Sequence, residues 1–245
     1  YVALMTFILI FSSVTMVLAV DAGHHMNKSK VTFYMLLTII GGAVFVGSQA
    51  WEWKNFIKGE YGALETKGGQ ILQFVNSDTG KRVAIADFAV SIPTERSTHK
   101  LSNGIWYENE GSLPTYSLVE VLEGFESNNN LVIRTEKLDE NGHKIVLTRD
   151  DSLDKIYNAI GVVEGANLVH NEYGNRLFAD FFFFITGFHG FHVFSGVIIN
   201  LIIFFNVIVG TYEKRGHYEM VEKVGLYWHF VDLVWVFVFT FFYLV

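Results

Sequence analysis

One stretch decides the fold of this chain: residues 177–209 read LFADFFFFITGFHGFHVFSGVIINLIIFFNVIV. The only charged residue in it is Asp180, close to its start. Because about 20 apolar residues are enough for a helix to cross the hydrocarbon layer of a bilayer, this stretch predicts a membrane-spanning helix. Taken alone, it could also be a buried helix of a soluble protein.

Three further runs have the same apolar character: residues 1–20, 31–50 and 224–245. The last of them is interrupted only by Asp232. Four such runs in one chain favour membrane spans over buried helices. We therefore predict an all-α transmembrane helix bundle with four visible spans. Because Tyr1 already lies inside an apolar run, we expect this bundle to be part of a larger one.

The short connections between spans carry positive charge. Lys28 and Lys30 lie between the first two spans, and Lys214, Arg215 and Lys223 lie between the last two. Basic residues in short loops mark the cytoplasmic side of a membrane. The long segment between the second and third spans is then predicted to lie outside.

That long segment, residues 60–172, is acidic. It holds 18 Asp and Glu against 10 Lys and Arg, a balance of −8, whereas the whole chain has a net charge of −7. Such a domain is unsuited to nucleic acid. Its charge could attract a basic partner, or it could only keep an outer domain soluble.

The segment also differs from the spans in its local pattern. Four short apolar or alternating runs predict strands: residues 71–75, 82–90, 131–138 and 144–148. Asn141-Gly142 signals a tight hairpin and Asn103-Gly104 another turn, while residues 152–163 predict a short helix. We expect a small mainly-β or α+β domain at 60–172, flanked by transmembrane parts at 1–59 and 173–245.

The chain contains no cysteine. Disulfides, thiolate metal sites, iron–sulfur clusters, c-type haem attachment and a cysteine-bridged copper centre are thereby excluded. Any redox cofactor would depend on the nine histidines.

Two pairs of polar residues stand inside the last two spans. His189 and His192 are three residues apart and share a helix face, and His229 and Asp232 have the same spacing and could face them. These residues could hold a metal or a haem. From spacing alone, interhelical hydrogen bonding and lipid contact is the favoured interpretation.

At the outer end of the second span, Glu52 lies between Trp51 and Trp53. Tryptophans are common where a helix meets the membrane surface, so we interpret the three residues as interfacial. Glu52 could serve as a proton-relay group, but a solvated or paired carboxylate is the commoner case.

Two motifs in the last two spans resemble those of a known protein family. Residues 182–193 (FFFITGFHGFHV) and 222–235 (EKVGLYWHFVDLVW) resemble, in order and spacing, the last two helices of subunit III of cytochrome c oxidase. Upstream, residues 12–16 (SSVTM) and 49–53 (QAWEW) resemble the two preceding helices of the bacterial caa3-type or aa3-like form. The acidic insert replaces a short loop of the family.

The resemblance implies a core subunit of a proton-pumping oxidase complex in a bacterial inner membrane, without catalytic, cofactor-binding or metal-binding residues of its own. Haem and copper would lie in partner subunits, and this chain would contact subunits I and II, bind phospholipid and support proton uptake. The residues expected to form its structural or lipid-binding polar cluster are His189, His192, Glu222, His229, Asp232, Trp228 and Trp235.

The insert would then lie in the periplasm. We expect it to dock a basic carrier such as cytochrome c or another respiratory complex. Two competing hypotheses remain: a membrane haem or metal redox protein that uses His189, His192 and His229 with Asp232, and a receptor whose insert is the ligand domain.

Overall fold

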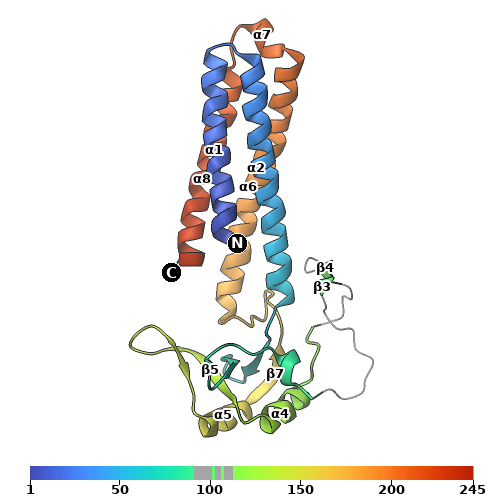
Figure 1. Ribbon diagram of the computed structural model, residues 1–245, viewed down its shortest axis with the longest axis vertical. Coiled ribbons are helices and arrows are strands. Elements are labelled where there is room, and N and C mark those ends of the chain that lie inside the picture. Colours follow the sequence, from blue (N-terminus) through green and yellow to red (C-terminus); the bar gives the residue numbers. More distant parts are fainter. Residues whose placement is uncertain (91–100, 103–105, 108–112, 245) are drawn as a thin grey trace. The chain divides into compact units, whose positions relative to one another are not determined.

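The computed structural model describes residues 1–90, 101–102, 106–107 and 113–244 (Figure 1). The chain divides into two compact units, one made of residues 1–52 and 182–245 and the other of residues 53–181. The second unit therefore includes the end of one long helix and the start of the next, besides the predicted insert at 60–172.

The first unit is built from long helices. Its elements are α1 (Val2–His24), α2 (Lys28–Lys58), α6 (Arg176–Val209), the short α7 (Thr211–Arg215), α8 (Glu219–Phe239) and a π-helical turn, η1 (Thr240–Leu244). Among the described residues, α1, α2, α6 and α8 with η1 are the four helices long and apolar enough to cross a membrane. The predicted all-α membrane bundle is confirmed.

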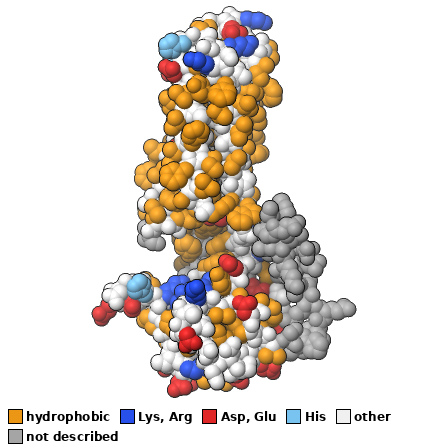
Figure 2. Space-filling model, viewed as in Figure 1, with side chains coloured by type: hydrophobic (Ala, Val, Ile, Leu, Met, Phe, Trp, Pro, Cys, Tyr) orange, Lys and Arg blue, Asp and Glu red, His pale blue; other side chains and the backbone are white. Residues whose placement is uncertain are grey.

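Aromatic residues fill the interior of this bundle and also cover its outside. Trp228 and Trp235 of α8 and Phe45 of α2 are almost fully buried. Outward-facing Phe184 and Phe188 are 71% and 62% exposed, and hydrophobic side chains dominate the visible bundle surface (Figure 2). So large an apolar surface would promote aggregation in water, whereas lipid chains solvate it.

The second unit contains a five-stranded antiparallel sheet with strand order β6-β5-β2-β1-β7. Its strands are β1 (Ala63–Thr66), β2 (Ile71–Asn76), β5 (Leu131–Leu138), β6 (Lys144–Val146) and β7 (Ala159–Val163). A separate two-stranded pair is formed by β3 (Leu101–Ser102) and β4 (Trp106–Tyr107). The described part of the insert is thus an α+β domain, as predicted.

Three short helices accompany this sheet: α3 (Ile85–Phe88), α4 (Leu118–Ser127) and α5 (Arg149–Ile156). Leu72 and Phe74 of β2 pack with Phe125 of α4 and Ile156 of α5 in one hydrophobic core. Ser117 and Glu120 form a capping box at the start of α4, which satisfies backbone N–H groups that a helix start leaves open.

The sequence predicted part of this domain correctly. Residues 71–75, 131–138 and 144–146 are strands, and Gly142, with φ of +80°, lies in the turn between β5 and β6. Residues 131–138 alternate weakly but pair along β2, which fixes them as a strand. The turn expected at Asn103-Gly104 lies outside the described residues.

Two expectations were wrong. Residues 82–90 are not one strand, because after a single bridge at Arg82 the chain turns into α3 and buries Ile85. Residues 152–163 are not one helix: α5 starts at its Thr148 cap and ends at Ile156, and Ala159–Val163 pairs with β1 as an edge strand. No sequence pattern predicted β1 or α4.

Candidate functional site

Two tryptophans of the YWHFVDLVW segment bind α8 to α1. The Trp228 Nε1–H group donates to the Ser12 hydroxyl at 3.1 Å, and the Trp235 Nε1–H group donates to the Thr6 hydroxyl at 2.9 Å. All four side chains are buried. A buried indole N–H needs an acceptor, so each pair fixes the two helices in one register.

The polar residues between these tryptophans also face α1. The Ser13 hydroxyl and the His229 Nδ1 atom share a hydrogen bond of 2.5 Å, and Ser13 also contacts the Asp232 carboxyl group. His229 and Asp232 are therefore brought together, as their spacing predicts. Their common partner is a serine of the first span, within the SSVTM motif of residues 12–16.

His189 lies elsewhere in the bundle. It is 4% exposed, its ring stacks on Trp235 at 5.0 Å between ring centres, and the edge of Phe45 lies at 5.8 Å. Its Nε2 atom is buried without a hydrogen-bond partner among the described residues. An aromatic enclosure of this kind suits a neutral imidazole that packs as an aromatic ring.

His192, one turn further along α6, is half-exposed and donates from Nδ1 to the Phe188 carbonyl oxygen at 2.8 Å. Both α6 histidines line a groove of about 250 Å³ between α6 and α8. The groove is lined by Phe184, Ile185, Phe188, His189, His192, Phe230, Val231, Val234 and Val238. It is a mostly apolar cavity with two imidazoles on one wall.

The residues of the predicted polar cluster do not form one site. His229 and Asp232 do not line the groove of His189 and His192. Glu222 is exposed in the first turn of α8 and lines a separate pocket together with His24 and His217. In the described ranges, no three His, Cys, Asp or Glu side chains form a group that could hold a metal ion.

Glu52 makes two polar contacts inside the first unit. Its carboxylate accepts from Gln49 Nε2 at 3.0 Å and from the Tyr243 hydroxyl at 2.7 Å, which connects α2 to η1. Trp51 packs on the ring of Tyr1 at 4.7 Å. Trp53 belongs to the second unit. The interfacial role of Trp51, Glu52 and Trp53 stays a prediction. The hydrogen bond between Gln49 and Glu52 joins residues three apart on one helix, a spacing that the sequence shows directly.

The insert contains a buried carboxylate that sequence reasoning overlooked. Glu172 is fully buried, and its two oxygens accept backbone N–H groups from Glu60, Tyr61, Gly62 and Gly165 at 2.6–3.2 Å. This contact closes the two ends of the insert on each other. No local pattern predicts this contact, because three of its four partners lie 110 to 112 residues away from Glu172 in the chain.

A bundle of four apolar helices with an α+β insert defines a multi-pass membrane protein with an extramembrane domain. Residues 156–245 match the family model of cytochrome c oxidase subunit III. This C-terminal part of the chain is similar to that family, which confirms the resemblance carried by its two motifs.

Individual cytochrome c oxidase subunit 3 proteins are also similar to part of this chain. A probable cytochrome c oxidase subunit 3 of Rickettsia conorii is 43% identical over 75 residues, which is 30% of this chain and 26% of the relative. Cytochrome c oxidase subunit 3 of Thermostichus vulcanus is 38% identical over 79 residues, 29% of this chain and 37% of the relative. That of Synechocystis is 42% identical over 78 residues, 31% and 33% of the two chains. The matches span roughly a third of each relative.

Proposed function

We propose that the chain is a non-redox subunit III of a proton-pumping cytochrome c oxidase in a bacterial inner membrane, with haem and copper held by partner subunits I and II. The observation that carries this is the use of the motif side chains in helix packing: His229 bonds Ser13, and His189 stacks on Trp235. Side chains held in this way would position the bundle against the catalytic subunit.

The competing redox hypothesis is tested by an optical spectrum and a metal analysis of the purified chain. It needs His189, His192 and His229 as ligands, yet His229 lies against α1 and outside the groove of the other two. We expect no haem band and less than stoichiometric metal. A Soret band that survives purification of this chain alone would overturn the proposal.

We further propose that the groove between α6 and α8 holds a phospholipid chain. Its walls are mostly aliphatic and aromatic, and lipid chains fill such apolar grooves without polar partners. Replacing Val234 by tryptophan should fill the groove and remove most of the phospholipid that co-purifies, measured as phosphorus per chain. Leu233→Trp is the matched control, because Leu233 is 57% exposed and outside the groove. Equal lipid loss in both variants would contradict the assignment.

Support for proton uptake is proposed at the ends of α1 and α8 that carry the basic connections. His24, His217, Glu219 and Glu222 line one pocket there, of about 230 Å³. Imidazoles and carboxylates can exchange protons near neutral pH. In the assembled oxidase, replacing His24 and His217 with glutamine should slow proton uptake at the inner side, whereas His143→Gln in the insert should leave it unchanged.

The acidic insert is proposed to dock a partner on the periplasmic side. Its balance of −8 is the support, since opposite charge accelerates encounters at low salt. Replacing residues 60–172 by a short Gly-Ser linker should slow turnover with a basic cytochrome c at low salt and have a smaller effect at high salt. If turnover and assembly with other respiratory complexes are both unchanged, neither docking partner is correct.

A further inference from the structure

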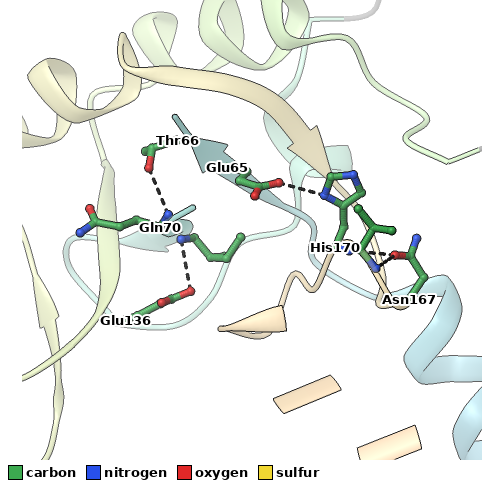
Figure 3. A network of polar contacts seen from close by, with 8 residues as sticks. Glu65, Thr66, Gln70, Glu136, Asn167 and His170 are labelled. Atoms are coloured by element: carbon green, nitrogen blue, oxygen red, sulfur yellow. Dashed lines mark hydrogen bonds and ion pairs between the residues drawn. The ribbon is translucent and has the colours of Figure 1, made fainter. Parts of the chain in front are cut away.

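The sheet of the insert has two unlike faces. Leu72 and Phe74 of β2 pack toward α4 and α5, whereas Gln73 between them points to the other side, opposite Arg134 of β5. We call this second side the polar sheet face, formed by Glu65, Gln73, Arg134, Glu136 and Lys144. Figure 3 shows its two carboxylates: Glu136 accepts the Ile71 N–H group at 3.2 Å, and His170 contacts Glu65 at 2.9 Å.

Three cations gather at this face, and all of them bind neutral acceptors. Arg134 donates from Nε and Nη2 to Gln73 Oε1 at 3.2 and 2.8 Å, and Lys144 Nζ donates to the Tyr173 carbonyl oxygen at 3.3 Å. Arg82 donates to the Gly62 carbonyl oxygen at 3.4 Å and lies over the Tyr61 ring at 4.4 Å. Within the described part of the chain, none of the three forms an ion pair with a carboxylate.

The neighbouring carboxylates already have other partners. Glu172 accepts four backbone N–H groups, Glu136 accepts the N–H of Ile71, and Glu65 contacts His170. Gln73 cannot compensate the charge either, because its amide is neutral and donates to the carbonyl oxygens of Glu172 and Tyr173. Among the described residues, no carboxylate therefore accepts a hydrogen bond from the three cations.

The cations also destabilise one another. Burial lowers the pKa of Lys144, and the nearby Arg134 and Arg82 lower that pKa further, against a smaller opposite effect of the Glu136 carboxylate. Burial lowers the pKa of Arg82, the nearby Glu172 carboxylate raises it in part, and Arg134 lowers it; the Arg82 Nε atom has no hydrogen-bond partner among the described residues. A bound anion would relieve this repulsion and give the open N–H groups an acceptor. Guanidinium groups match the tetrahedral oxygens of phosphate especially well.

We propose that Arg82, Arg134 and Lys144 form a binding site for a phosphate group. The group could belong to a phospholipid headgroup or to a soluble phosphate compound. A headgroup is favoured by position, because Tyr173, whose carbonyl oxygen Lys144 binds, stacks on Phe56 in the end of α2 at 4.7 Å and 10°. The site consists of residues of the insert, none of which lines the groove between α6 and α8, and it does not depend on the oxidase assignment.

The test measures binding to the full chain after delipidation in detergent, by calorimetric titration. One arm uses inorganic phosphate, and the other uses dihexanoyl phosphatidylglycerol below its micellar concentration. We expect Lys144→Gln to weaken binding by about tenfold, the loss of one charge-assisted hydrogen bond, and Arg134→Gln with Lys144→Gln to abolish it. Lys155→Gln is the matched control, because Lys155 is an exposed lysine on α5, which packs on the other face of the sheet.

Each outcome decides the proposal. Tighter binding of the phospholipid identifies a headgroup site, and binding of inorganic phosphate alone identifies a soluble ligand; both support it if the Lys144 variant loses affinity. Absence of binding to the unaltered chain, or equal affinity in Lys144→Gln and Lys155→Gln, would overturn it. Lys144→Gln also covers the case in which the double variant fails to fold, because the lysine side chain is only half-buried.

Discussion

Replacing Gly42 with leucine should prevent the helical bundle from forming. A Cβ atom at Gly42 would overlap the six-membered part of the Trp228 ring and lie 2.8 Å from Val197 Cγ2. Neither neighbour can withdraw easily, because Trp228 is 1% exposed and held by its bond to Ser12. Extra methylenes in a filled core cost about 1–3 kcal/mol, and a whole leucine at a helix crossing costs more.

The measurement is thermal loss of helical circular dichroism in detergent, together with the yield of monodisperse protein. Gly47→Leu is the matched control: it lies on the same helix, and nothing lies within 4 Å of its Cβ position. We expect Gly42→Leu to give little or no monodisperse protein, or protein that loses its helical signal at a much lower temperature. Gly47→Leu should behave like the unaltered chain. Equal behaviour of the two variants would contradict the close approach of α2, α6 and α8.

Glu172→Ala should unfold the insert and leave the membrane helices intact. The substitution removes both carboxylate oxygens and leaves four backbone N–H groups without an acceptor inside the domain. Each buried donor without a partner costs about 1–3 kcal/mol, so the total loss approaches the whole stability of a small domain. Glu172→Gln should be intermediate, because an amide oxygen can replace only one of the two acceptor atoms.

Limited proteolysis and amide hydrogen exchange of the full chain measure this effect. Residues 60–62 and 165 should lose protection in Glu172→Ala, while amides inside α6 and α8 stay protected. Glu60→Gln is the control, because the Glu60 side chain is exposed and only its backbone contacts Glu172. Retained protection at residues 60–62 in Glu172→Ala would show that the carboxylate does not hold the ends of the insert together.

The sequence was sufficient for the membrane bundle because hydrophobic length alone defines a span. It could not give the rotation of each helix. In α6, phenylalanines lie on every side, so no apolar face shows where His189 points, and the pairing of His229 with Ser13 rather than with the α6 histidines had no local signal. In a membrane, apolar residues face lipid and core alike, and packing between helices decides the rest.

Within the insert, the predictions for residues 82–90 and 152–163 were wrong for a different reason. The short apolar run at residues 159–163 is compatible with a helix or a strand, and its pairing with β1 makes it a strand. The Glu172 contact and the three cations of the polar sheet face join segments that are distant in the chain, so spacing cannot reveal them. By contrast, Asn141-Gly142 was predicted correctly, because a tight hairpin depends on the two turn residues themselves.

The most direct test of the central claim is purification of the native chain from its membrane in mild detergent, followed by identification of the co-purifying proteins and an optical spectrum of the complex. A subunit of an oxidase should emerge together with haem-bearing and copper-bearing subunits, and Gly42→Leu should lose that association while Gly47→Leu keeps it. Recovery of the intact chain without oxidase subunits and without haem absorbance would contradict the account.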